Sequence, residues 1–208
     1  TASDSSGGVN GGILINGAAW NTTDYKVGTG AMSFDGSNDY ISIPHNNIFS
    51  PTNAITIGFW VKFNGVPPDE NNSIYEKGIS TDANDYRIRV QATKVLSLRT
   101  NNSTNNLTTN KTYVAGQWSH YVFTGDANGL KAYVNGVLDN FNTTPFVGAI
   151  NTSALGLGAR GDGSNKVPVG FFLDDIRVYN RALSSAEITE LYNYTGAPAS
   201  LANLAPTV

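Results

Sequence analysis

A short stretch of the sequence, SFDGSNDYISIP at residues 33–44, gathers oxygen-bearing side chains between two apolar runs. Asp35, Asn38 and Asp39 carry carboxylate or amide oxygens, and Gly36 can offer its backbone carbonyl within the same turn. Calcium binds six to eight oxygens of these kinds. The spacing does not match an EF-hand loop, so a calcium site here needs further ligands from a distant part of the chain.

The same residues can also form a tight turn without a metal. In that interpretation Gly36 takes a positive φ, and the Asp35 carboxylate accepts a hydrogen bond from the backbone two residues further on. The residues by themselves leave both interpretations open.

Composition excludes several classes of function. The 208 residues carry a net charge of −3, and only 14% of them are charged, so the basic surface that binds nucleic acid is missing. Cysteine is absent, which excludes disulfides, thiolate metal sites and a thiol nucleophile. No apolar run reaches the roughly 18 residues of a membrane-spanning helix, so we expect no membrane insertion.

Short β-type runs separated by Gly, Asn, Asp and Pro dominate residues 31–179. In DYRIRVQA, apolar residues alternate with Arg87 and Arg89, as in a strand with one face toward solvent. Asn135-Gly136 is a type I′ hairpin signal. This pattern predicts an all-β fold, an antiparallel two-sheet sandwich.

One short helix follows the last strand. Ser184 and Glu187 have the spacing of a capping box, and Ile188, Leu191 and Tyr192 share one helix face. After Gly196 the uncharged, Ala/Pro-rich segment 197–208 reads as a linker or an extended tail. We therefore expect one domain over residues 1–196.

Five segments carry a family resemblance. They are AMSFDGSNDYISIP, AITIGFWVKF, GQWSHYVFTGD, LKAYVNGVL and GFFLDDIRVYNRALSSAEITELYN, in that order along the chain. Together they resemble the laminin-G-like, concanavalin A-like jelly-roll family of secreted bacterial proteins. The resemblance implies a jelly-roll sandwich of two antiparallel sheets with one short C-terminal helix, loops that bind ligands and, in many members, a bound calcium ion.

The resemblance also supplies a distant calcium ligand. In related glucanase jelly rolls, the first Asp of a strand similar to LDDIRVY holds a structural calcium together with a glycine carbonyl. By position, Asp174 and Gly36 would have these roles here, together with Asp35, Asn38 and Asp39. The neighbouring Asp175 is expected to pair with Arg177 or Arg181.

Sugar recognition requires aromatic faces for stacking and planar polar side chains for hydroxyl groups. The three tryptophans, Trp20, Trp60 and Trp118, occupy positions that the family uses in its core. The predicted ligand-binding residues are therefore the exposed polar and aromatic side chains of the middle strands, Tyr75, Tyr86, Arg87, Arg89, Arg99 and Tyr113.

The loop ARGDGSNKVP repeats the DGSN sequence of the acidic turn and is long enough to hold a ligand or a second ion. Its Arg160 and Asp162 are added to the predicted ligand-binding residues. Arg160-Gly161-Asp162 also spells an adhesion tripeptide, but such triplets often occur by chance.

Catalysis is not predicted. Glycoside hydrolysis needs two carboxylates about 5–9 Å apart, and the Glu-x-Asp-x-x-Glu strand of the glucanase jelly rolls is missing. Of the four glutamates only Glu76 lies on a strand, where pairing with a lysine is expected. His45 and His120 are the only histidines, and His120 belongs to a strand that the family uses structurally.

Two functions follow. The first is a non-catalytic, calcium-stabilised module of a larger secreted or bacterial cell-surface protein that binds polysaccharide or a glycoconjugate. The alternative is a structural or adhesive subunit that assembles with neighbouring copies by strand exchange of residues 197–208. The alternative is motivated by an opening strand that family members have before Asp4, for which Thr1 leaves no room, because an open sheet edge can accept a strand from a neighbour.

Overall fold

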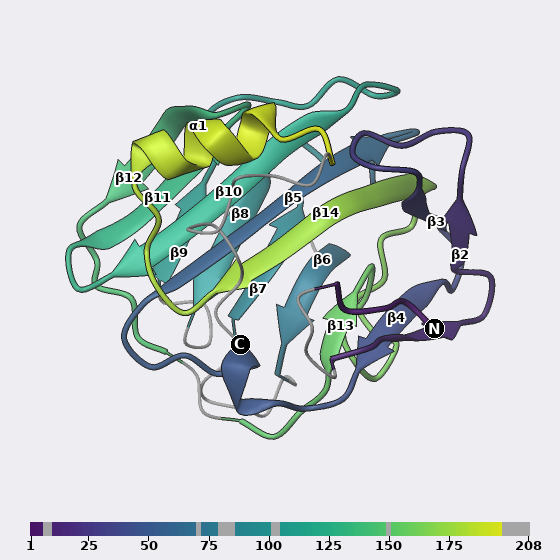
Figure 1. Cartoon of the computed structure of the whole chain (residues 1–208), viewed down its shortest axis with the longest axis horizontal. Coiled ribbons are helices and arrows are strands. Elements are labelled where there is room, and N and C mark those ends of the chain that lie inside the picture. The colour runs from purple at the N-terminus through teal and green to yellow at the C-terminus, as the bar shows by residue number, and fades with distance from the viewer. Residues whose placement is uncertain (6–9, 70–71, 79–85, 101–104, 149–150, 197–208) are drawn as a thin grey trace.

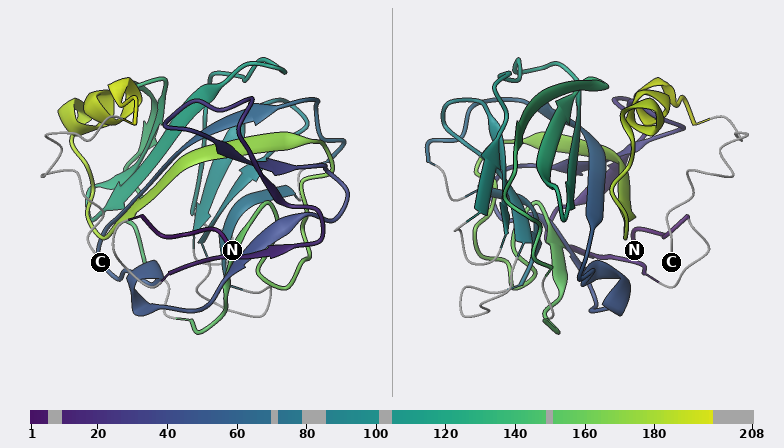
Figure 2. Two further views of the ribbon diagram at one scale, coloured as in Figure 1. Left: turned by 45° about the vertical axis from the view of Figure 1, so that its right-hand side comes forward. Right: turned by 90° about the vertical axis from the view of Figure 1, so that its left-hand side faces the viewer.

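The computed structural model describes residues 1–5, 10–69, 72–78, 86–100, 105–148 and 151–196. Two antiparallel sheets of seven strands each pack face to face, and one helix lies on the outside of the second sheet (Figures 1 and 2). We name the sheets after their central strands, the β6 sheet and the β5 sheet. The prediction of an all-β jelly-roll sandwich with one short C-terminal helix is confirmed.

The β6 sheet contains, in spatial order, β1 (Ile13–Ile15), β4 (Tyr40–Ile43), β13 (Leu155–Leu157), β6 (Asn72–Lys77), β7 (Tyr86–Val90), β8 (Leu96–Thr100) and β9 (Asn105–Thr108). The β5 sheet contains β12 (Val137–Asn142), β11 (Gly129–Val134), β10 (Ser119–Asp126), β5 (Ile55–Phe63), β14 (Phe171–Tyr179), β3 (Ala31–Phe34) and β2 (Ala19–Asn21). A short 3-10 helix, η1 (Asn47–Phe49), follows β4, and α1 (Ser185–Asn193) follows β14.

The core lies between the sheets because the strands alternate apolar and polar residues. On β7, Tyr86, Ile88 and Val90 face inward and are at most 1% exposed. They meet inward residues of β5 such as Ile57 and Phe59, which are equally buried. The polar side chains between them, including Arg87, must therefore lie on the outer face of the β6 sheet.

Helix α1 covers the outer face of the β5 sheet. Ser184 caps it with the predicted reciprocal bonds to Glu187, and buried Ile188 and Leu191 join a second apolar cluster with Val122 on β10. The two turn residues Asn135 and Gly136 both have positive φ, 53° and 78°, as the hairpin signal predicts. Since α1 occupies the β5 side, no described helix lies over the outer face of the β6 sheet.

His120 on β10 is 2% exposed and lies under α1, with its ring 5.0 Å from Trp60 and 5.9 Å from Tyr192. Burial lowers the pKa of His120 to about 3, and the charge of Arg177 acts in the same direction. The unfolded chain therefore binds a proton near pH 6.5 that the folded chain does not, so stability falls as the pH decreases from 6.5 toward 3.

We expect His120 to account for a loss of about 2 kcal/mol between pH 7 and pH 5, since each pH unit below 6.5 costs about 1.4 kcal/mol. Urea unfolding at both pH values measures it. His120→Phe keeps a ring but cannot titrate, so its stability should change less over this range. An equal acid loss in wild type and His120→Phe would contradict the assignment.

Candidate functional site

The outer face of the β6 sheet carries a cluster of polar side chains from three neighbouring strands. Glu76 on β6 lies opposite Arg87 on β7, which in turn lies opposite Arg99 on β8. Two residues away, Arg89 pairs in register with Ser97 on β8. Three arginines on two adjacent strands therefore project from one face. We call this set the arginine face.

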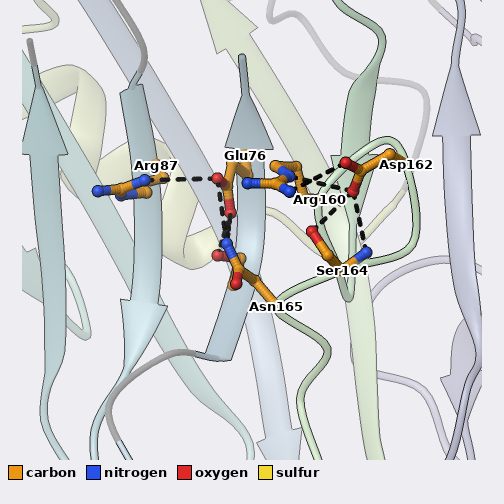
Figure 3. Close-up of polar contacts among 7 residues, drawn as sticks. Glu76, Arg87, Arg160, Asp162, Ser164 and Asn165 are labelled. Atoms are coloured by element: carbon orange, nitrogen blue, oxygen red, sulfur yellow. Dashed lines mark hydrogen bonds and ion pairs between the residues drawn. The ribbon is translucent and has the colours of Figure 1, made fainter. Parts of the chain in front are cut away.

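Glu76 is the centre of the arginine face. Its side chain is fully buried, and one carboxylate oxygen lies 3.5 Å from the Arg87 guanidinium (Figure 3). The Ser73 hydroxyl donates a hydrogen bond to the same carboxylate, and the Asn165 amide lies 3.3 Å and 3.5 Å from its two oxygens. A buried charge needs such partners, because an isolated carboxylate away from water is costly.

A loop from the far end of the sequence brings Asn165 to this face. Between β13 and β14 the chain folds back over the outside of β13, where Gly156 leaves it room: a Cβ there would lie 2.3 Å from the Ala159 carbonyl oxygen. The backbone amide of Ser73 donates to the carbonyl of Asn165 at 2.8 Å, which fixes the loop against β6.

Arg160 and Asp162 form a two-point ion pair in this loop, with N–O distances of 3.0 Å and 2.9 Å (Figure 3). The Ser164 hydroxyl and amide also donate to Asp162, at 2.7 Å and 3.0 Å. Hydrogen bonding from Arg160, the largest cause, holds the pKa of Asp162 well below its usual range. Asp162 therefore stays ionised near neutral pH and cannot donate a proton as a general acid.

The arrangement suits hydrogen bonding to a polyhydroxylated ligand. Guanidinium groups carry several donors in fixed planes. Of the three arginines, Arg99 is the most open to a ligand, while Glu76 holds Arg87 in place from below the surface. In the described part of the chain, no group of three or more His, Cys, Asp or Glu side chains is placed to hold a metal ion.

The predicted ligand-binding residues lie in two places, the arginines on the outer face of the β6 sheet and the tyrosines in the core. Arg87, Arg89 and Arg99 lie together on the arginine face, and the loop of Arg160 and Asp162 packs beside it. The expectation that all three arginines are exposed is wrong for Arg87 and Arg89, which are 8% and 6% exposed, whereas Arg99 is partly exposed. Their role in binding stays a prediction.

The expectation that the three tyrosines are exposed is wrong. Tyr75 and Tyr86 are each 1% exposed because strand alternation turns them into the core, where their hydroxyls lie 3.1 Å apart. Tyr113 is 2% exposed; it packs on Phe63, and its hydroxyl donates to the Gly65 carbonyl. No ring face of the three is available for stacking on a sugar.

The expectation that Trp20 belongs to the core is also wrong, since it is 57% exposed. Trp60 is buried under α1 as expected, with its ring stacked on Tyr192. Trp118 is half-buried, and its indole N–H donates to Asp24. Trp20 is thus the most exposed of the three tryptophans.

The acidic turn has the geometry of the predicted Asx-turn. Asp35 accepts a hydrogen bond from the Ser37 amide at 2.7 Å, and Gly36 has a φ of 84°. The backbone carbonyl of the exposed Asn38 accepts a hydrogen bond from the side-chain amide of Asn16. Buried Asp39 accepts the backbone amides of Gly17 and Asp35 at 2.7 Å and 2.9 Å. Its two oxygens therefore already have donors, and N–H donors compete with a cation.

The Asp174 carboxylate does not lie beside the acidic turn. Gly36 packs against Val169 and Gly170, and Asp174 lies four residues further along the chain, or about 13 Å in an extended strand. Its carboxylate accepts the amides of Lys26 and Val27, both at 2.7 Å, and that of Asp175 at 2.8 Å. Burial raises the pKa of Asp174, although these hydrogen bonds oppose the rise. Calcium binding at these residues stays a prediction. The backbone N–H groups that already donate to the Asp39 and Asp174 carboxylates do not favour it.

Sequence reasoning missed Glu76 and Asn165 as residues of the arginine face. The prediction that Glu76 pairs with a lysine is wrong: it faces Arg87, while the adjacent Lys77 binds Asn151 and the Ser153 carbonyl. The available signal was strand alternation, which places consecutive residues on opposite faces. Asp175 does pair with Arg177, at 2.9 Å, as expected.

Comparison with solved structures gives the same fold at low sequence identity. Domain 4 of AbnA, an extracellular GH43 arabinanase from Geobacillus stearothermophilus solved with arabinotriose, has a TM-score of 0.72 at 23% identity, covering 91% of this chain and 92% of that one. The binding domain of Paraclostridial Mosquitocidal Protein 1 has a TM-score of 0.72 at 18% identity, covering 92% of this chain and 50% of that one.

A further structure comes from work on botulinum neurotoxin type C, whose cell entry depends on two ganglioside molecules. It has a TM-score of 0.66 at 14% identity, covering 89% of this chain and 47% of that one. The present chain thus spans about half the length of the toxin domains it matches. Among the described residues, no helix has both the length and the apolar character needed to cross a membrane.

A search of curated protein sequences finds no match. The model of one protein family matches residues 35–189, which include the acidic turn, the arginine face and most of α1. With three quarters of its length matched by that model, the chain belongs to the concanavalin A-like lectin/glucanases superfamily.

Proposed function

We propose that the chain is a non-catalytic binding module that recognises a polysaccharide or a glycoconjugate through the arginine face. The observation that carries the proposal is the fully buried Glu76 held by Arg87 and Asn165, beside Arg89 and Arg99. A prepositioned network of planar donors and acceptors on a sheet suits sugar hydroxyl groups, because it loses little side-chain entropy on binding.

The structural neighbours support a binding role. One was solved with arabinotriose, another is named as the binding domain of a mosquitocidal protein, and the work on a third concerns gangliosides. The arabinanase is named as extracellular, which supports a secreted or cell-surface parent protein. At these identities the likeness concerns the fold, so the ligand of the present chain rests on its own residues.

Hydrolysis is the less favoured function. It requires one carboxyl group to donate a proton and a second carboxylate on the other side of the scissile bond. On the arginine face and its loop, the two described carboxylates are Glu76, which is enclosed by hydrogen bonds, and Asp162, which stays ionised beside Arg160. Glu76 is also fully buried, so a scissile bond cannot reach it, and Asp162 has no proton to give.

The test is binding of the 208-residue chain to a panel of immobilised polysaccharides and ganglioside glycans, with arabinan included. Arg99→Gln removes one charged donor from the arginine face and should weaken the best binding about tenfold or more, as for loss of a charged hydrogen bond. Lys131→Gln removes an equal charge from an exposed site on β11 and should leave binding unchanged.

Two results would contradict the proposal. Absence of retention on every glycan, with calcium present and with chelator, would remove the binding function. Equal affinity for wild type and Arg99→Gln would move the site away from the arginine face.

A further inference from the structure

A groove of about 650 Å³ runs between the two sheets and opens at the edge where β14 passes β3 and β2. Its walls are mainly apolar and include Leu14, Met32, Ile41, Phe49, Leu155 and Leu173. Protein interiors normally contain few voids larger than a water molecule. An apolar space of this size between packed sheets therefore calls for an occupant.

One side of the groove is an open strand edge. β14 pairs with β3 only at Phe171–Leu173, and a register shift then bends it at residues 174–177, where Asp175 has a φ of 45°. Beyond the shift, Arg177–Tyr179 pair with β5, and no described strand pairs with their other edge. Open backbone donors and acceptors favour an extended peptide over a lipid or a small apolar molecule.

Trp20 lies at the mouth of this groove. It is in register with Met32, which is in register with Leu173, so the three side chains share the inner face of the β5 sheet. Met32 and Leu173 are 7% and 1% exposed, whereas Trp20 is 57% exposed. A large inward-facing aromatic residue is thus mostly exposed at the groove opening.

The chain itself arrives at the same place after α1. The Tyr194 ring lies 4.4 Å from the Arg177 guanidinium, and the Gly28 amide donates to the Thr195 carbonyl at 3.4 Å. Gly196 has a φ of 86°, and a Cβ on it would lie 2.5 Å from the Gly28 nitrogen. Gly196 also lines the groove, so the described part of the chain ends at its mouth.

We propose that residues 197–208 of the same chain dock in this groove along the open edge of β14 and cover Trp20. The segment carries no charge, and Leu201 and Leu204 can supply the apolar side chains that the walls would accept. Leu201 is five residues from Gly196, a reach of up to about 17 Å. Attachment at the mouth gives the segment an effective concentration on the order of millimolar, which favours it over a second copy.

The test compares Leu201→Asp/Leu204→Asp with Ser200→Asp/Asn203→Asp, which adds the same two charges beside the leucines. Hydrogen exchange of the Ile176–Tyr179 amides and acrylamide quenching of tryptophan fluorescence report on the groove. In the leucine variant we expect exchange to quicken about tenfold, quenching to increase and the melting temperature to drop by several degrees. The control should match the wild type, and all three proteins should be monomers.

Two outcomes overturn the proposal. Exchange and quenching that are equal in the leucine variant and the wild type would mean that the segment does not occupy the groove. A wild-type dimer that the leucine variant converts to monomers would mean that the segment fills the groove of a second copy. Neither outcome bears on the arginine face, whose glycan binding is measured separately.

Discussion

Replacing Glu76 by glutamine is expected to lower the free energy of unfolding by about 3 kcal/mol, in the range seen when one partner of a buried ion pair is removed. Glutamine keeps the shape of the side chain but removes the charge that faces Arg87 at 3.5 Å. The Ser73 hydroxyl and the Asn165 amide also lose a charged acceptor. Urea unfolding with a constant m-value measures the loss.

Two controls separate the ion pair from a general effect of lost charge. Glu190→Gln changes an exposed glutamate on α1 and should alter stability by less than about 0.5 kcal/mol. In Glu76→Gln/Arg87→Met both partners of the pair are gone, so the double variant should be more stable than the sum of the two single losses predicts. A Glu76→Gln protein as stable as the wild type would show that the charge is not needed in the fold.

Local patterns in the sequence predicted much of the fold. Alternation in YRIRV placed Arg87 and Arg89 on an outer face, and the spacing of Ser184 and Glu187 identified the start of α1. Both signals come from neighbouring residues, because strand period and helix capping are properties of a few consecutive positions. The acidic turn is local too, and its Asx geometry was correctly predicted.

Contacts between distant segments were not predictable in the same way. Asn165 reaches Glu76 across 89 positions, through a loop that must fold back over β13. The β6–β7 register contains a shift between Ser73 and Tyr75, so the partner of Glu76 depends on a bulge that no local pattern announces. Trp20 is a further case, since its exposure follows from its place at the mouth of a groove that distant segments of the chain line together.

Asp174 shows how one residue can fit two different structural roles. The family resemblance predicts that Asp174 is a calcium ligand together with Gly36. In the structure, its carboxylate instead accepts hydrogen bonds from the backbone amides of Lys26 and Val27 and holds them beside β14. That contact joins segments 147 and 148 positions apart, at a site that is 8% exposed. A carboxylate that accepts several hydrogen bonds from backbone amides contributes to stability without any metal.

Asp174→Ala should therefore lower the free energy of unfolding by about 3 kcal/mol even in chelator, because three backbone amides lose their acceptor. For a chain of this size that corresponds to a drop of roughly 6–12 °C in the melting temperature. Asp174→Asn retains one acceptor oxygen and should lose less. Asp35→Ala, at an exposed carboxylate of the acidic turn, provides the matched acidic control and should change the melt in chelator only slightly.

The same melts, repeated in calcium, test the predicted cation site. A ligand that binds only the folded chain, at about a hundredfold over its Kd, adds roughly 2.7 kcal/mol. If calcium binds through Asp174, the wild type will melt several degrees higher in calcium than in chelator, and Asp174→Ala will show no such difference. Identical wild-type melts in both buffers would contradict calcium binding, and a large loss in Asp174→Ala would then come from the amide contacts alone. A calcium effect that survives in Asp174→Ala but disappears in Asp35→Ala would assign the ion to the acidic turn without Asp174, since the two carboxylates belong to separate parts of the fold.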